Sequence, residues 1–126
     1  RHGESANPLN PFASWCGALA MSVADVGPAG RPPTSQELYA AGRVIGYKCF
    51  DQNYEFMKCK AKDDSPTACA AEGDEVHKCV YGLFKEIASK TPKQFNVLSK
   101  CLDSEDLQPH MCKAKQEAFE SAFYGN

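Results

Sequence analysis

Residues 49–79 read CFDQNYEFMKCKAKDDSPTACAAEGDEVHKC, and this stretch carries cysteines at intervals of ten. The four positions are Cys49, Cys59, Cys69 and Cys79. Ten residues of α-helix span about 15 Å and lead from position a of one heptad to position d of the next, so both cysteines of each C-x9-C unit lie on one side of a helix. When two such helices pack antiparallel, Cys49 faces Cys79 and Cys59 faces Cys69. The spacing therefore predicts a helical hairpin that two disulfides can close.

The last third of the chain repeats this pattern with two cysteines in place of four. Thr91 stands ten residues before Cys101, and Ala122 stands ten residues after Cys112. Four units can thus be aligned, starting at residues 49, 69, 91 and 112. The residue seven positions after each start is apolar: Phe56, Val76, Leu98 and Phe119. The residue three positions after each start is polar: Gln52, Glu72, Gln94 and Lys115. We therefore predict an internal repeat, with an inner disulfide Cys101–Cys112 and an outer disulfide lost at Thr91 and Ala122.

The rest of the chain predicts further helices and no convincing strand, so we expect an all-α fold of two tandem disulfide-linked helical hairpins. The residues from Thr34 to Glu37 form a capping-box pattern, which predicts a helix over about 35–47. Ser65 and Pro66 predict the start of the long helix that carries the third and fourth cysteines.

Two more X-Pro pairs, Thr91-Pro92 and Gln108-Pro109, predict the starts of two short helices, with Thr91 as the N-cap of the first. Five of the eight prolines precede residue 34, which predicts an extended arm there. We expect three segments: an extended, uncharged and proline-rich docking arm, a first hairpin with its preceding helix, and a second, degenerate hairpin, over residues 1–33, 34–90 and 91–126.

Residues 5–24 carry no charge. The prolines in this stretch exclude a membrane-spanning helix, while four large apolar side chains are costly to leave in water: Phe12, Trp15, Leu19 and Met21. A disordered leader is one interpretation, and a docking arm that covers a partner or the membrane edge is the one we favour. Cys16 is expected to be unpaired, buried or docked and not catalytic, because no histidine or basic neighbour lowers its pKa.

Composition excludes several classes of protein. Seven cysteines in 126 residues indicate an oxidising compartment. The net charge of −2, with lysines scattered among acidic residues, argues against nucleic-acid binding. No apolar run is long enough for a transmembrane helix, so we expect a peripheral protein. The sequence starts at Arg1 without a methionine, so we expect it to be processed or incomplete.

No pattern of catalytic or metal-binding residues stands out. Zinc ligands usually lie two to four residues apart, whereas sulfurs ten residues apart on one helix cannot converge on a single ion. The sequence contains no phosphate-binding glycine loop, dinucleotide fingerprint or nucleophile elbow. We therefore expect no catalytic residue, no cofactor and no metal. We also expect that reduction unfolds both hairpins alike, because neither is large enough to fold on its buried area alone.

The twin C-x9-C hairpin resembles the coiled-coil–helix–coiled-coil–helix family of the mitochondrial intermembrane space. Within that family, the segments GYKC, EFMKC and EGDEVHKC, at 46–49, 55–59 and 72–79, are similar to members that are accessory subunits of respiratory complex I. Thr91 and Ala122 depart from the family pattern, which has cysteines there.

This resemblance implies a non-catalytic subunit on the intermembrane-space side of the mitochondrial inner membrane. Such a subunit stabilises the membrane arm of complex I and its assembly, and its partners are the membrane-arm subunits on that face. The resemblance also implies a transient contact with an import oxidoreductase, for which the apolar side chains beside Cys79 offer a docking surface: Val80, Leu83 and Phe84. The alternative within the same family is an assembly factor or a thiol-redox protein.

Overall fold

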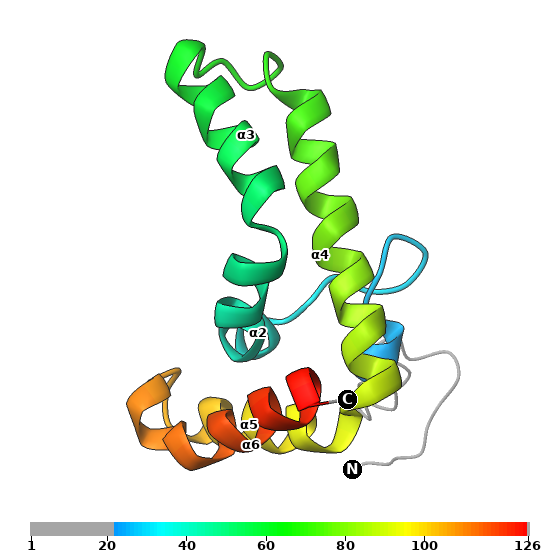
Figure 1. The fold of residues 1–126 in the computed structure, drawn as a ribbon, viewed down its shortest axis with the longest axis vertical. Coiled ribbons are helices and arrows are strands. Elements are labelled where there is room, and N and C mark those ends of the chain that lie inside the picture. Colours follow the sequence, from blue (N-terminus) through cyan, green and yellow to red (C-terminus); the bar gives the residue numbers. More distant parts are fainter. Residues whose placement is uncertain (1–21, 126) are drawn as a thin grey trace, which may run out of the picture.

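The computed structural model describes residues 22–125, and in these residues the protein is all-α, as predicted (Figure 1). The elements in chain order are η1 (Val23–Asp25), α2 (Ser35–Lys48), α3 (Phe50–Lys62), α4 (Ala70–Lys90), α5 (Pro92–Ser104), η2 (Pro109–Cys112) and α6 (Lys113–Gly125). Helices α3 and α4 form one antiparallel hairpin, and α5 and α6 form a second one that lies across its foot.

Helix α2 begins where the sequence predicts it. The Thr34 hydroxyl accepts a hydrogen bond from the Glu37 backbone N–H at 3.2 Å, and Glu37 Oε1 accepts one from the Thr34 N–H at 2.9 Å. This reciprocal pair is a complete capping box, which satisfies two backbone donors at the start of the helix. Helix α2 buries one face, with Ala40, Ala41 and Val44, and ends one residue later than expected.

The predicted start of the long helix is wrong. Helix α4 begins at Ala70, with Cys69 at the N-cap, and Ser65 and Pro66 belong to the turn that precedes it. Asp63 causes the difference, because its carboxylate accepts the Ser65 backbone N–H at 3.0 Å and so forms a local turn. This hydrogen bond also holds the pKa of Asp63 below its ordinary value.

The second hairpin begins at Pro92, the first residue of α5, as predicted. A turn with two residues of positive φ, Asp106 and Leu107, joins α5 to η2. The Leu107 N–H donates to the Leu102 carbonyl at 2.8 Å, which satisfies one of the last carbonyl groups of α5. Leu107 also packs against the core, so a residue with a costly backbone conformation is held by buried contacts.

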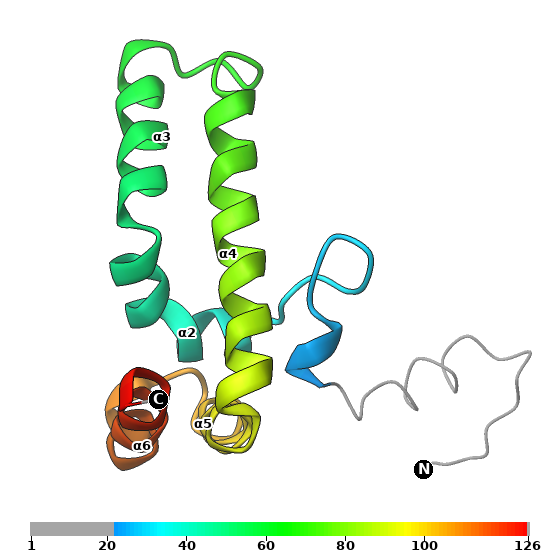
Figure 2. The same cartoon turned by 45° about the vertical axis from the view of Figure 1, so that its right-hand side comes forward.

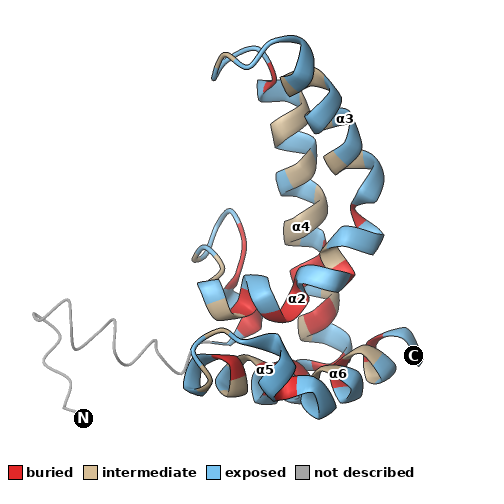
Figure 3. Ribbon diagram, turned by 90° about the vertical axis from the view of Figure 1, so that its left-hand side faces the viewer, coloured by how far each residue is buried: buried red, intermediate tan, exposed pale blue. Residues whose placement is uncertain are grey.

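The two hairpins meet at one end of the molecule (Figure 2), and one hydrophobic core joins them there, where buried residues gather in Figure 3. We call this part the base, and it comprises α2, α4 from Val80 onward, α5, η2 and α6. The buried side chains of the base include Val44, Leu83, Phe84, Ile87, Phe95, Leu98, Leu102, Phe119 and Phe123. By contrast, α3 contains no buried residue. Helix α2 precedes the first hairpin in the chain but packs mainly on the second one, where it lies against α5.

The described end of the N-terminal arm packs on the base. Val23 and Val26 are buried in the core, and η1 lies against α4 and α5. Backbone hydrogen bonds close a tight turn between Asp25 and Arg31. Residues 22–33 thus fold against the protein itself, because two valines reach apolar contacts there.

Candidate functional site

The structure brings each expected cysteine pair to bonding distance. The Sγ–Sγ distances are 2.07 Å for Cys49–Cys79, 2.13 Å for Cys59–Cys69 and 2.14 Å for Cys101–Cys112. The Cα–Cα distances of 5.9, 5.9 and 6.1 Å lie in the ordinary range for disulfides. Every cysteine of the described residues is therefore oxidised and leaves no nucleophilic thiol in the hairpins.

One group of potential metal ligands occurs in residues 22–125, at the turn of the first hairpin. It consists of Cys59, Cys69 and Glu72, whose ligand atoms lie within 4.8 Å of one another. Metals bind cysteine as thiolate, and both sulfurs here are bonded to each other. The group is therefore a disulfide with a neighbouring carboxylate.

Thr91 and Ala122 occupy the positions where the repeat predicts a second disulfide of the α5–α6 hairpin. Thr91 is the N-cap residue of α5, but its side chain makes no capping hydrogen bond. It is almost completely buried, and its hydroxyl has no hydrogen-bond partner. Ala122 is half-buried in α6. A lost disulfide at this pair of positions stays a prediction.

The four apolar side chains expected in the docking arm lie outside the described residues, and so does Cys16. The three apolar residues beside Cys79 do lie within them. Leu83 and Phe84 belong to the core, and Val80 packs against it half-buried. These side chains offer no docking surface in the folded protein, because the hairpin that carries them is packed on the base.

An ion pair that the sequence analysis missed holds the arm to α2. The Arg31 guanidinium donates to both carboxylate oxygens of Glu37, at 2.8 and 2.7 Å, and to the Ser22 carbonyl at 2.8 Å. Burial by itself raises the pKa of Glu37, but the hydrogen bonds from Arg31 and Thr34 outweigh this effect and hold the pKa below its ordinary value. The signal for this ion pair in the sequence was Arg31, which lies six residues before Glu37 of the capping box.

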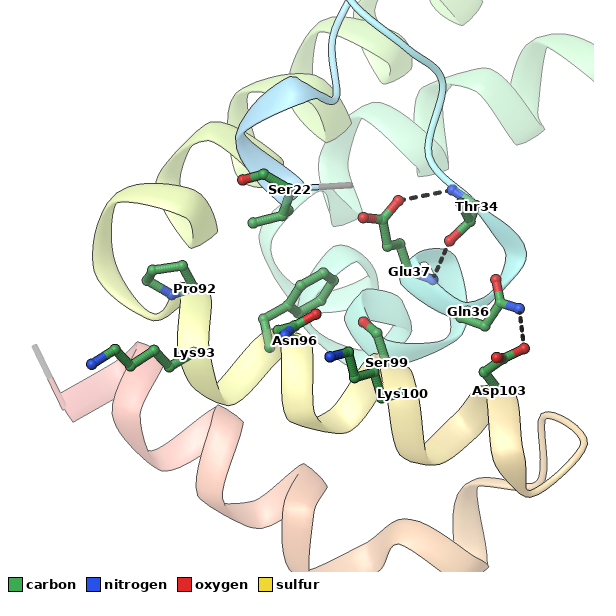
Figure 4. A pocket seen from close by; sticks show the side chains of 12 residues that line it. Ser22, Thr34, Gln36, Glu37, Pro92, Lys93, Asn96, Ser99, Lys100 and Asp103 are labelled. Atoms are coloured by element: carbon green, nitrogen blue, oxygen red, sulfur yellow. Dashed lines mark hydrogen bonds between the residues drawn. The ribbon is translucent and has the colours of Figure 1, made fainter. Parts of the chain in front are cut away.

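A groove of about 580 Å³ lies between η1, the start of α2 and α5 (Figure 4). Its lining is mixed, with Phe95 beside Lys93, Asn96 and Lys100. The carboxylates at its edge are already bound, Glu37 by Arg31 and Asp103 by the Gln36 side chain at 2.7 Å. The groove therefore holds no free acid–base pair.

A second feature that the sequence analysis missed is a stripe of exposed side chains on α2, α3 and α6. We call it the aromatic stripe, and its members are Tyr47, Phe50, Tyr54, Met57 and Tyr124. Tyr47 meets Tyr124 edge to face with ring centroids 6.0 Å apart, and Phe50 stacks on Tyr54 at 5.9 Å. Partial burial raises the pKa of the Tyr124 phenol. The spacing of the first four members, from Tyr47 to Met57, is three or four residues, and this was the signal in the sequence.

The comparisons with known proteins agree on one family, although no protein-family model matches the chain. The chain is 37% identical over 88 residues to NADH dehydrogenase (ubiquinone) 1 alpha subcomplex subunit 8-A of Arabidopsis thaliana, covering 70% of this chain and 82% of the relative. It is 36% identical over 88 residues to subunit 8-B of the same plant, covering 70% of this chain and 83% of the relative. It is 25% identical over 95 residues to the NADH-ubiquinone oxidoreductase 20.8 kDa subunit of Neurospora crassa, covering 74% of this chain and 52% of that protein. The chain therefore belongs to the family of NADH dehydrogenase (ubiquinone) 1 alpha subcomplex subunit 8.

Proposed function

We propose that this chain is a non-catalytic accessory subunit of respiratory complex I that stabilises the membrane arm and its assembly. The observation that carries the proposal is the family membership, since the relatives are named as subunits of this NADH dehydrogenase. The oxidised cysteines support a scaffold role, because the described hairpins hold no thiol for turnover.

The proposed site of action is the intermembrane-space face of the mitochondrial inner membrane. Three disulfides in a chain of 126 residues support an oxidising compartment, because disulfides seldom persist where glutathione keeps thiols reduced. Among the described residues, no helix is both long and apolar enough to span a bilayer. The partners in this proposal are membrane-arm subunits exposed on that face.

The experiment is to express a tagged copy in cells that lack their own copy of this protein. On a native gel, the tagged chain should comigrate with the band that has NADH dehydrogenase activity, and the amount of that band should depend on the chain. Recovery of the chain only apart from the mature complex would favour an assembly factor. Alkylation before reduction should label Cys16 alone, and labelling of a hairpin pair would favour a thiol-redox protein.

A transient contact with an import oxidoreductase forms a separate part of the proposal. Because Leu83 and Phe84 are buried after folding, this contact has to form on the reduced chain before α4 packs on the base. Alanine at Val80, Leu83 and Phe84 should lower the import of the reduced chain into isolated mitochondria. Alanine at Phe95 and Phe119 removes comparable core contacts away from Cys79, and an equal effect on import would contradict the proposed contact.

A further inference from the structure

We propose that the aromatic stripe is the surface through which this chain binds another protein subunit. This inference rests on the proposed function, since it presumes that the chain is part of a larger assembly. The partner is expected to present an apolar helix face with polar groups for the tyrosine hydroxyls.

The first argument is exposure. The five side chains of the stripe are between 48% and 73% exposed, although large aromatic groups gain most from burial. At about 200 Å² each, they offer roughly 600 Å² of exposed surface in total. This matches the upper end of the largest apolar patch on a typical monomer, and it is about three quarters of what one partner buries in a standard interface.

The second argument is that the stripe is held rigidly. Phe50, Tyr54 and Met57 lie on successive turns of α3, and the disulfides of Cys49 and Cys59 on its other side fix the helix to α4. The contact between Tyr47 and Tyr124 joins this surface to α6. A rigid surface loses little conformational entropy when it binds, so the arrangement favours a specific interface.

The third argument is chemistry, which favours a protein over a lipid surface. Three of the five side chains are tyrosines, whose hydroxyls need polar partners when buried, and the stripe contains no leucine, isoleucine, valine or tryptophan. Tyrosine, phenylalanine and methionine are the residues enriched in protein interfaces.

Two cations flank the stripe, and each already has an acidic partner within the chain. Lys58 Nζ lies 5.0 Å from the centroid of the Tyr54 ring and 3.1 Å from the Glu55 carboxylate. The Arg43 side chain is 76% exposed and contacts Glu120 of α6 at 3.3 Å. A partner therefore meets aromatic rings flanked by paired charges, which favours an apolar helix face with polar groups around it.

The test compares two variants with three serine substitutions each in the native-gel experiment. The first carries Phe50→Ser, Tyr54→Ser and Met57→Ser in the stripe. The matched control carries three exposed apolar residues elsewhere, at Leu38→Ser, Val97→Ser and Met111→Ser. Both should keep three disulfides and the far-ultraviolet spectrum of the wild type, because surface substitutions change stability little. The stripe variant should lose about tenfold or more of the comigrating chain, and the control should not.

A photoreactive phenylalanine at position 54 then identifies the occupant in intact mitochondria. A crosslink to another subunit of the complex supports the proposal. A crosslink to lipid or to a second copy of this chain overturns it, and so does comigration of a correctly folded stripe variant at the wild-type level. If the wild-type chain itself does not comigrate, the proposed function fails and this inference fails with it. The result for the wild type thus separates the two failures.

Discussion

At the scale of the residue, Arg31 and Glu37 join two features that the sequence presents separately. Glu37 completes the capping box of α2 and also accepts both guanidinium bonds that hold residues 22–33. Both groups are shielded from water, with side-chain exposures of 19% for Arg31 and 8% for Glu37. The pair is therefore worth more than an exposed ion pair, because removing one partner leaves a charge poorly solvated.

Glu37→Gln should lower the free energy of unfolding by about 1–2 kcal/mol at pH 7, measured by urea unfolding of the oxidised protein. The pKa of Glu37 in the folded protein lies below its ordinary value of 4.5. Its contribution is therefore complete above pH 4.5 and is lost as the pH falls through the folded pKa. The difference between wild type and variant should shrink in acid. Glu75→Gln, in an exposed pair with Lys78, is the control and should cost less than about 0.5 kcal/mol.

Thr91→Val should stabilise the protein by about 1 kcal/mol. The Thr91 hydroxyl is buried without a hydrogen-bond partner, and valine has nearly the same shape without the cost of burying that group. Thr34→Val is the matched substitution at the N-cap of α2, where the hydroxyl does accept a hydrogen bond, and it should cost about 1 kcal/mol. The two changes should move the melting temperature in opposite directions. A loss of stability at Thr91 would show that its hydroxyl is satisfied.

At the scale of the element, the two hairpins share a pattern and differ in what holds them. Seven positions into each unit, Leu98 and Phe119 of the second hairpin are buried, whereas Phe56 and Val76 of the first are half-buried. The first hairpin has two disulfides and contributes three buried residues to the core, all near the end of α4, whereas the second has one disulfide and contributes six. Apolar packing thus takes the role of the absent disulfide in the second hairpin.

The double substitution Thr91→Cys and Ala122→Cys should form a fourth disulfide, because the repeat matches this pair to Cys49–Cys79. Because the two positions are separated by 31 in the sequence, the gain in unfolding free energy is at most about 3–4 kcal/mol. Mass spectrometry after alkylation, with and without reduction, counts the bonds. Thr91→Cys alone should leave one additional free thiol. Two additional free thiols in the double variant, beside Cys16, would contradict the proposed correspondence between the hairpins.

The sequence was sufficient for the helices and the cysteine pairs because both depend on local spacing. Intervals of ten fix which sulfurs share a helix side, and the Thr34–Glu37 capping box fixes where α2 begins. The start of α4 was predicted wrongly because a side chain outside the helix, Asp63, captures the N–H of Ser65. The packing of α2 on α5 and the ion pair between Arg31 and Glu37 depend on tertiary contacts, and the spacing of residues along one segment does not reveal these.

At the scale of the whole molecule, stability is divided unevenly along the long axis. The α3–α4 hairpin extends away from the base (Figure 1), and α3 has no buried residue beside its two disulfides. The base contains the core, which includes four phenylalanines, each in ring contact with the next: Phe84, Phe95, Phe119 and Phe123. Each disulfide contributes about 3 kcal/mol, whereas each fully buried core side chain contributes about 1.5–3 kcal/mol.

This division revises the sequence-based expectation that reduction unfolds both hairpins alike. We now expect reduction to release α3 and the first half of α4, and to leave the base folded but weaker. Hydrogen exchange measured by mass spectrometry, before and after dithiothreitol, separates the two parts. Peptides from 50–62 should lose protection on reduction, and peptides from 92–104 should keep most of theirs, because α5 places Phe95, Leu98 and Leu102 in the apolar core whereas α3 buries no residue.

Two double serine variants separate the contributions of individual disulfides to stability. Cys59→Ser with Cys69→Ser should release the outer end of the hairpin, whereas Cys101→Ser with Cys112→Ser should leave α5 protected at a cost of about 3 kcal/mol in global stability. Equal loss of protection in 50–62 and 92–104 after reduction would mean that the core of the base does not stay folded without the disulfides. The aromatic stripe would then depend on oxidation in the same way as the base. If the expected difference is observed, oxidation acts mainly on α3, the helix that carries most of the stripe, and so controls binding more than folding.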